Sequence, residues 1–496
     1  MTSTLLRGGR IHGPSRPHAT ALLVRDGVVE WVGHDPDRPA DEIVDLDGAL
    51  VTPAFVDAHV HSTSAGLLRT GLDLTGCRSM AELLARVRDR SAPGALVWGH
   101  GWDETAWPEG RPPTRAELDE ASGGAAVYLS RIDVHSALVS TALVTPRART
   151  AAGWSDGDPV SRAAHHVVRK AFLDSITPAQ RRAAQREFLR HAASMGVTAV
   201  HECAGPDISG ADDFADLLAL SAEPLPEVIG YWGERNTVLP DGARGLAGDL
   251  FVDGALGSRT AALGTAYADR PDTAGALYLD AEQIAEHVVA CTLAGIQAGF
   301  HVIGDAAVAA VVAGFARAER IVGVPALRGS RHRLEHLEMV TAEQAALLGR
   351  WGVIGSVQPL FDAAWGGRDG MYARRLGPDR GSALNPFAHL EKAGVVLAFG
   401  SDCPVTPVDP WAAVRAAVHH RTDGFGLAPW SAFAAHTRGG WYAAGVDGAG
   451  ELVPGAPATY AVWDCAGFPS LEPGAPLPVC LRTVRDGRII YERGSA

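Results

Sequence analysis

Paired cysteines are absent from this sequence. None of its six cysteines forms a CxxC pair, which argues against a disulfide framework and against a thiolate zinc site. We expect reduced and mostly buried thiols. The six are Cys77, Cys203, Cys291, Cys403, Cys465 and Cys480.

Long apolar runs and runs of a single charge sign are also lacking. No stretch approaches the ~20 apolar residues of a membrane span, and residues 1–20 contain no signal-peptide core, so we expect a cytoplasmic protein without a membrane partner. The net charge of −13 arises from 57 acidic and 44 basic residues spread along the chain. This distribution argues against a nucleic-acid partner.

A pair of histidines at the end of an apolar run is the most informative feature that is present. His59 and His61 close the segment VTPAFVDAHVH. On a β-strand, residues i and i+2 point the same way, so the two imidazoles share one face. Neutral imidazole binds zinc, iron or nickel, and this pair is half of a transition-metal site. Among 19 histidines the spacing also arises by chance, so the motif needs partners.

Three later segments supply such partners. GIQAGFHVIGD reaches His301, RHRLEHLEMV carries His336, and GVVLAFGSDCPV delivers Asp402, each after an apolar run of β type. One strand end with an imidazole or carboxylate is weak evidence. Four of them in sequence order indicate a shared site.

The order of segments predicts an α/β protein built on a (β/α)8 TIM barrel. β-type runs alternate with alanine-rich helical stretches, as in repeated βα units. Such a barrel places its active site at the carboxyl ends of its strands, where these polar residues fall. The eight predicted strands lie near residues 51–59, 196–205, 226–233 and 248–257, before His301 and His336, at 352–359, and before Asp402.

Two further regions complete the predicted domain organisation. Short β runs with turns occur at both ends, so residues 1–50 and 448–496 are expected to pair into one small β-domain, with the barrel over 51–447. Residues 66–195 are read as a large insertion after the first barrel strand. A long excursion over the active-site mouth commonly shapes a substrate pocket.

With these motifs in place, the chain resembles the amidohydrolase superfamily. The HxH pair, FHVIGDAAV, RHRLEH and FGSDCPV are similar to its metal-site motifs. The flanking text GWDE, DGALGSRTAAL, SVQP and GSDCPV resembles the amidohydrolase-3 branch, the YtcJ-like proteins that include N-substituted formamide deformylases. The resemblance covers almost the whole chain. It implies that the terminal β-domain is a composite β-sandwich, and it mildly favours a homodimer.

One position departs from the family pattern. Many binuclear members carry a lysine on the fourth barrel strand, carboxylated to bridge two metals, and in this branch it precedes the DG of the DGALG-like motif. Here the stretch reads GDLFVDG, with Asp249 at that position. The only two lysines, Lys170 and Lys392, are in helical contexts, so a carboxylated-lysine bridge is not expected. Asp249 is either a shorter bridging carboxylate or a polar residue at a strand start.

The expected site binds one divalent metal, with zinc as the first candidate, although iron, manganese and nickel also accept such ligands. The expected ligands are His59, His61, His301 and Asp402. Bound metal lowers the pKa of water towards about 7, Asp402 then acts as general base and acid, and His336 binds the water and stabilises the oxyanion. The alternative is a two-metal site with His301 and His336 on the second ion.

Alternation along RHRLEH makes a separate prediction. It places His332, Leu334 and His336 on one face of a strand, with Arg333 and Glu335 on the other. Of the two histidines, His336 is the expected ligand. We expect His332 to be structural.

Several other polar residues are candidates by position or by family similarity. Asp57 precedes the HxH pair by two residues and is a candidate for a carboxylate that orients a ligand histidine. For each candidate substrate contact, a role in packing or in stabilising a loop is the alternative. These candidates are Trp102, Asp103, Arg131, His135, Arg259 and Gln358.

Together these features predict a metal-dependent hydrolase of a small molecule that cleaves a carbon–nitrogen bond, other than a peptide bond, in an amide, N-acyl or N-formyl group. Deamination of a cyclic amidine is the alternative within the superfamily, because the same attack on a ring carbon expels ammonia. An inactive relative that binds metal or ligand is the alternative from another class. The complete set of motif histidines together with Asp402 argues against it.

Overall fold

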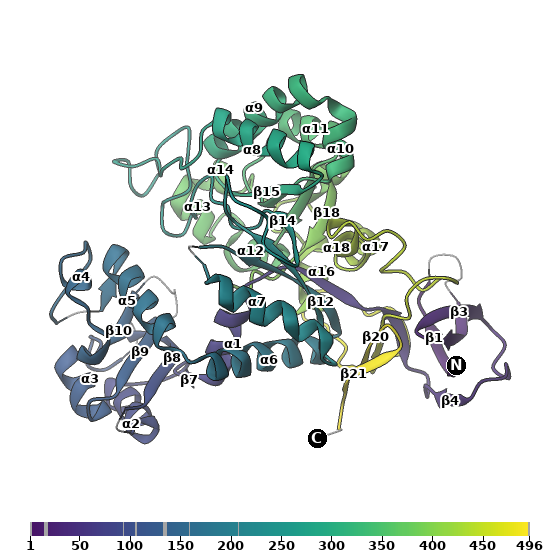
Figure 1. Cartoon of the computed structure of the whole chain (residues 1–496), viewed down its shortest axis with the longest axis horizontal. Coiled ribbons are helices and arrows are strands. Elements are labelled where there is room, and N and C mark those ends of the chain that lie inside the picture. The colour runs from purple at the N-terminus through teal and green to yellow at the C-terminus, as the bar shows by residue number, and fades with distance from the viewer. Residues whose placement is uncertain are drawn as a thin grey trace. The chain divides into compact units, whose positions relative to one another are not determined.

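The structure is a computed structural model of the chain that separates into two compact units. One unit contains Met1–His61 with Leu189–Ala496, and the other contains Ser62–Phe188. Both are traced in Figure 1. The described residues are 2–13, 18–92, 94–104, 107–131, 136–157, 159–206 and 208–494.

A nearly closed barrel of parallel strands forms the centre of the first unit, which confirms the predicted fold class. Most of the strands are buried along their length, as expected for parallel strands covered by helices. The last strand meets the first through backbone hydrogen bonds from His61 N to Cys403 O and from Asp402 N to His59 O, both 2.8 Å. In spatial order the strands are β6 (Phe55–Val60), β12 (Val197–Ala204), β13 (Glu227–Trp232), β14 (Ala243–Leu246), β15 (Gln297–Val302), β16 (Arg333–His336), β17 (Ile354–Val357) and β18 (Val396–Phe399).

The fourth barrel strand is not where the sequence predicted it. Residues 248–257 were expected to form this strand, but it is β14, which ends at Leu246. Gly248 then turns the chain with a φ of +81°, a conformation that glycine adopts without a Cβ penalty. Within residues 248–257, all of them described, Phe251 alone makes an isolated bridge, to His301. The apolar run that looked like a strand is therefore a loop that leaves the end of the strand.

Helices of the first unit follow the barrel strands and begin and end with clear signals. Helix α8 begins at a capping box of Asp280 and Gln283 and ends at Gly295, whose φ is +69°. A second capping box, of Thr341 and Gln344, begins α11. These helices are α7 (Ala211–Ala219), α8 (Ala281–Ala294), α9 (Asp305–Val322), α10 (Val324–Ser330), α11 (Ala342–Arg350), α12 (Pro359–Trp365), α13 (Met371–Leu376), α14 (Pro378–Gly381), α15 (Phe387–Lys392), α16 (Pro410–Val418), α17 (Pro429–Ala435) and α18 (Arg438–Ala443).

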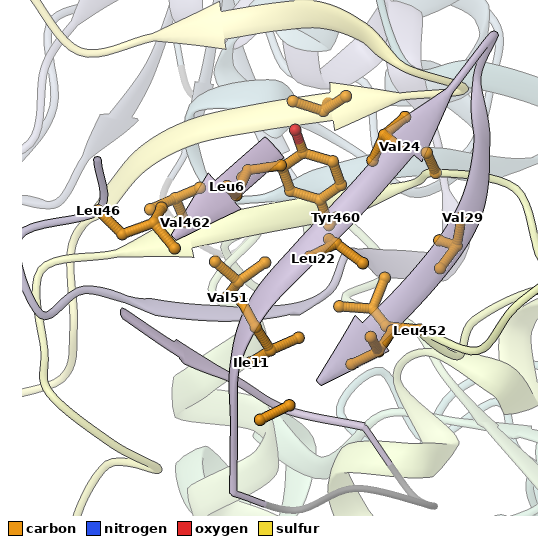
Figure 2. Close-up of a cluster of buried hydrophobic side chains, with 14 of the residues drawn as sticks. Leu6, Ile11, Leu22, Val24, Val29, Leu46, Val51, Leu452, Tyr460 and Val462 are labelled. Atoms are coloured by element: carbon orange, nitrogen blue, oxygen red, sulfur yellow. The ribbon is translucent and has the colours of Figure 1, made fainter. Parts of the chain in front are cut away.

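Both ends of the chain pair in one mixed sheet, as the sequence predicted. The join is antiparallel and aligns Leu50 with Trp463 and Pro53 with Tyr460. Side chains from both ends share one apolar core, in which Leu22, Val51 and Tyr460 are buried (Figure 2). In order the strands are β21 (Arg488–Glu492), β20 (Cys480–Arg485), β19 (Tyr460–Trp463), β5 (Leu50–Pro53), β1 (Ser3–Ile11), β2 (Ala19–Arg25) and β3 (Val28–Gly33), with β4 (Glu42–Asp45) paired to β1.

The second unit corresponds to most of the predicted insertion and has its own five-stranded sheet. Buried clusters on this sheet include Trp102, Leu118 and Leu129 in one and Tyr128 with Phe172 in another. That this insertion covers the active-site mouth stays a prediction. Its strands are β7 (Leu72–Asp73), β8 (Leu96–Trp102), β9 (Ala126–Arg131), β10 (Ser136–Val139) and β11 (Val160–Ser161). Its helices are α1 (Ser62–Thr70), α2 (Met80–Arg90), α3 (Arg115–Ser122), α4 (Pro146–Arg149) and α5 (Arg162–Ser175), and α6 (Pro178–Ser194) continues into the first unit.

Helices long and apolar enough to cross a membrane do not occur in the described ranges.

Candidate metal centre

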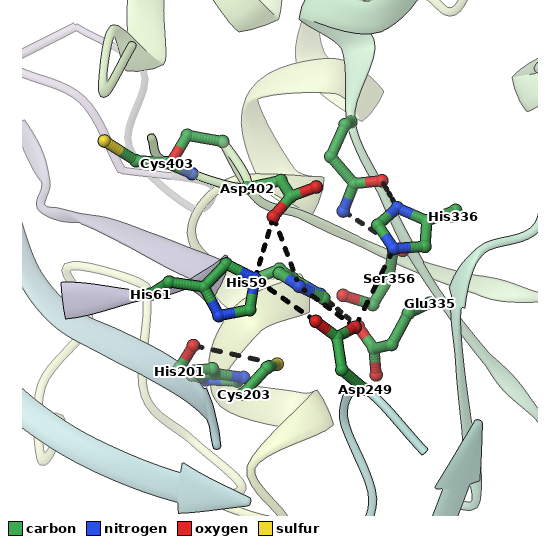
Figure 3. A network of polar contacts seen from close by, with 12 residues as sticks. His59, His61, His201, Cys203, Asp249, Glu335, His336, Ser356, Asp402 and Cys403 are labelled. Carbon is green, nitrogen blue, oxygen red and sulfur yellow. Dashed lines mark hydrogen bonds and ion pairs between the residues drawn. The ribbon is translucent and has the colours of Figure 1, made fainter. Parts of the chain in front are cut away.

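The HxH pair meets the carboxylate of Asp402 at the junction of the first and last barrel strands (Figure 3). His59 lies on β6 and His61 directly follows it. Their Nε2 atoms lie 3.5 Å and 3.1 Å from Asp402 Oδ1. Asp402 follows β18, has a φ of +54°, and donates its backbone N–H to His59 O. Barrel closure therefore brings these three side chains into one potential ligand set.

Asp249 reaches the same cluster. Its Oδ2 lies 3.2 Å from His61 Nε2, and its Oδ1 lies 3.6 Å from His59 Nε2 and 3.9 Å from His336 Nε2. A second potential ligand set is thus His59, Asp249 and His336, which shares His59 with the first. The loop that begins at Gly248 delivers the short side chain to the position where a longer residue was expected. Of the two interpretations from sequence, the geometry favours a carboxylate within ligand reach.

His336 joins the cluster because the strand pattern breaks at this residue. Its φ is +69° and that of Leu337 is +48°, so simple alternation fails at the end of β16. His332, on the opposite face, contacts Thr292 Oγ1 at 2.8 Å and accepts the Ala298 N–H at 2.9 Å. The prediction that His332 and His336 share a face was therefore wrong. The structural role expected for His332 agrees with these contacts.

His301 lies beside the cluster without belonging to any potential ligand set of the described residues. Its ring centroid is 4.5 Å from that of His336, and its Nδ1 is 3.9 Å from Asp253 Oδ1. Burial lowers the pKa of His301 to about 3, so the ring is neutral. The structure therefore associates His301 with His336, as in the two-metal alternative, and not with the set expected for a single metal.

Two side chains each contact the Nδ1 atom of a histidine in the cluster. Glu335 Oε2 lies 2.9 Å from His59 Nδ1, and Gln358 Oε1 lies 2.8 Å from His336 Nδ1. A metal-binding histidine commonly donates its second N–H to such an acceptor, which fixes the tautomer and turns the lone pair of Nε2 towards the metal. Glu335 was not singled out from the sequence. Gln358 was singled out as a candidate substrate contact, and that role stays a prediction beside its contact with His336.

Asp57 does not orient an imidazole. Its Oδ1 accepts backbone N–H groups from Ser401 at 2.8 Å and from His59 at 3.3 Å. These bonds join the first barrel strand to the segment after the last one. The second ring nitrogen of His59 is contacted by Glu335 and not by Asp57.

The electrostatics of the cluster favour a bound cation. Burial lowers the pKa of His61, but the neighbouring carboxylates of Asp249 and Asp402 outweigh burial and raise the pKa to about 10. Burial raises the pKa of Asp402, but the neighbouring histidines lower it by a larger amount. The pKa is therefore below its usual value, and the carboxylate is ionised. His59 Nε2, Asp249 Oδ1 and Asp402 Oδ1 are buried and make no hydrogen bond. Buried polar atoms are normally paired, so this donor set fits a divalent metal.

The remaining predicted contacts lie outside this cluster. In the insertion, Trp102 is fully buried and donates its indole N–H to Leu129 O, as a packing residue does. Arg131 pairs with Asp103 at 3.0 Å. His135 lies outside the described residues. In the first unit, Arg259 pairs with Asp269 at 2.7 Å. None of these contacts involves a member of the cluster.

Comparison with known proteins identifies the family. The family model described as "Amidohydrolase family" matches residues 42–491. The chain belongs to this family. The putative amidohydrolase YtcJ of Bacillus subtilis is 26% identical over 444 residues, which cover 81% of this chain and 80% of that protein. N-substituted formamide deformylase of Arthrobacter pascens is 30% identical over 149 residues, 27% of this chain and 28% of that protein.

A solved structure agrees with the family assignment. An uncharacterized metal-dependent hydrolase from Pyrococcus furiosus superimposes with a TM-score of 0.77 at 26% identity. The match covers 93% of this chain and 99% of the other. Family membership and the buried donor cluster together indicate an amidohydrolase that depends on a divalent metal.

Proposed function

We propose that this amidohydrolase hydrolyses the carbon–nitrogen bond of an amide, N-acyl or N-formyl group in a small molecule. The observation that carries the proposal is the buried cluster of His59, His61, Asp249, His336 and Asp402, whose unpaired nitrogen and oxygen atoms converge at the carboxyl ends of barrel strands. A similar segment in an N-substituted formamide deformylase supports formamides as members of the substrate class.

A divalent metal would be held by His59, His61 and Asp402, with Asp249 and His336 in the overlapping set. When bound, such a metal supplies Lewis-acid chemistry that lowers the pKa of water and polarises a carbonyl group. Zinc is the first candidate. The shared position of Asp249 makes a two-ion site a specific alternative, since one carboxylate lies close to histidines of both sets.

Asp402 is suited to move the proton. Its carboxylate is ionised and can therefore accept a proton from the attacking water. The same carboxyl group then protonates the leaving nitrogen, because release of an amine requires a proton that amide nitrogen lacks. The 2.8 Å hydrogen bond from its backbone N–H to His59 O holds Asp402 at the strand junction during both steps.

For His336 we propose metal binding, as in the two-metal alternative, in place of the water and oxyanion role expected with a single metal. Its Nδ1–H donates to Gln358 Oε1, so Nε2 carries a lone pair. A lone pair suits a metal ligand or a proton acceptor, whereas stabilising an oxyanion requires a donor. We therefore assign His336 to metal binding and not to the oxyanion.

Metal analysis and product analysis test the proposal. The purified chain should retain one or two equivalents of divalent metal after gel filtration. A panel of formamides, N-acyl amines and cyclic amidines should show an amine and a carboxylate as products. Ammonia release without a carboxylate would indicate a deaminase. If the unmodified chain and Asp402→Asn were equally inert on the whole panel, an inactive binding protein would replace the enzyme.

A further inference from the structure

A fully buried ion pair lies in the barrel beneath the metal cluster. Arg333 and Glu335 are both 0% exposed, and Arg333 Nε lies 2.6 Å from Glu335 Oε1. The second carboxylate oxygen contacts Arg333 Nη2 at 3.0 Å and His59 Nδ1 at 2.9 Å. We propose that Glu335, held by Arg333, is a positioning residue that fixes the tautomer of His59 and strengthens its Nε2 as a metal ligand. This inference rests on the proposed metal site.

Arg333 anchors Glu335 to several barrel strands at once. Its Nη2 donates to Ala58 O on β6 at 2.6 Å and to Ser356 Oγ on β17 at 2.9 Å. Its Nη1 lies 3.0 Å from His201 Nδ1 on β12. Because a guanidinium only donates, His201 Nδ1 must be the acceptor. The carboxylate of Glu335 is thereby held by a side chain that contacts three strands besides its own.

The position of Glu335 determines which nitrogen of His59 is available. An ionised carboxylate only accepts hydrogen bonds, so His59 Nδ1 must carry a proton, which leaves Nε2 as the nitrogen that can offer a lone pair to a metal. Arg333 contacts both carboxylate oxygens of Glu335, at 2.6 Å and 3.0 Å, which keeps the group charged. A charged acceptor behind a ligand imidazole raises the basicity of the ligand nitrogen. His59 Nε2 then faces Asp249 and Asp402 at 3.6 Å and 3.5 Å.

A purely structural ion pair is the competing explanation, because buried pairs also occur without any role at a site. The two explanations differ in what the charge of Glu335 affects. A structural pair affects folding stability and leaves the affinity of a folded protein for metal unchanged. A positioning pair affects metal affinity even where the protein is folded and the shape of the side chain is preserved.

Metal-binding measurements on the whole, metal-free chain distinguish the structural from the positioning explanation. Zn²⁺ affinity is measured by competition with a chromophoric chelator, and Co²⁺ absorption reports the ligand geometry. Glu335→Gln should bind Zn²⁺ roughly 10–100-fold more weakly than the unmodified chain and should show a changed Co²⁺ spectrum. The matched control is His332→Gln, which alters buried polar contacts on the outer face beside β16 and should bind Zn²⁺ as the unmodified chain does.

A second variant guards against misfolding. Glu335→Gln leaves the Arg333 charge buried without a partner, which is costly, whereas Arg333→Met/Glu335→Gln removes both charges. The double variant should fold and still bind Zn²⁺ at least tenfold more weakly. Affinity within twofold of the unmodified chain in either folded variant would overturn the inference, and so would an equal loss in His332→Gln. If the unmodified chain itself bound no divalent metal, the proposed metal-dependent function would be wrong, whatever the variants showed.

Discussion

Two polar layers inside the same barrel are equally buried but differ in their hydrogen bonding. In the lower layer, Arg333 and Glu335 bond to each other and to their surroundings. In the upper layer, Asp249 Oδ1 and Asp402 Oδ1 have no hydrogen-bond partner. Burial alone therefore does not distinguish a functional site from a structural network. The unpaired atoms do, because a buried polar group without a partner is costly unless a ligand satisfies it.

His59 belongs to both layers. Its Nδ1 is satisfied by Glu335 below, and its Nε2 faces the unpaired carboxylate oxygens above. A single imidazole thus connects the two layers, and the contact with Glu335 in the lower layer fixes its orientation in the upper one. Changes in the upper layer should mainly affect chemistry and metal binding. Changes in the lower layer should affect stability as well.

The largest expected effect comes from the upper layer. Asp402→Asn keeps the shape of the side chain but removes its ability to take and return a proton. The rate of hydrolysis, measured as kcat on the best substrate of the panel, should fall by about 10²–10⁴-fold. A decrease in kcat of less than tenfold would remove Asp402 from the proposed proton transfer.

Breaking the lower layer should mainly reduce stability. Arg333→Met leaves Glu335 charged, fully buried and without its ionic partner, so the free energy of unfolding should fall by about 3–5 kcal/mol. Urea unfolding of the metal-free protein measures the change. The Arg333→Met/Glu335→Gln variant should recover most of the loss. Equal destabilisation in the single and double variants would show that packing, and not charge, dominates this layer.

A smaller effect should follow from removing one charge above His59. Asp249→Asn preserves size but removes one of the two carboxylates that raise the pKa of His61 to about 10. In the metal-free protein that pKa should fall by about 1–3 units. An NMR titration of labelled histidine measures it, with Asp269→Asn, a carboxylate that pairs with Arg259 and Arg375, as the control. An unchanged His61 pKa would place Asp249 outside the cluster.

The parts of the fold that the sequence predicted are those set by local patterns. Continuous apolar runs such as β12 identified most barrel strands, and the HxH spacing placed His59 and His61 side by side. Paired β runs at both ends predicted the shared sheet. The fourth strand was misplaced because the apolar run at Leu250–Val252 resembles a strand, while Gly248 with positive φ turns it into a loop.

The parts that were missed depend on tertiary contacts or on backbone turns. Alternation alone could not show that positive φ at His336 reverses its direction. The partnership of Glu335 with His59 joins residues 276 positions apart, and no local pattern encodes it. One signal was available, since Arg333 and Glu335 are charged residues in a segment that must be buried in a barrel. Charged residues at such positions require partners.

The smallest expected effect concerns the outer face of the same strands, where histidines are neutral and paired. His287 Nε2 donates to Leu246 O at 2.9 Å, and burial lowers its pKa to about 4. Because the unfolded state binds the proton more tightly, this group contributes stability that is full above about pH 6.5 and is lost as pH falls towards 4. Over the interval from pH 7 to pH 4.5 the loss is about 2 kcal/mol. The melting temperature of metal-free His287→Gln should therefore fall less between pH 7 and pH 4.5 than that of the unmodified chain. Identical pH dependence would mean that acid sensitivity arises in the two inner layers and not on this face.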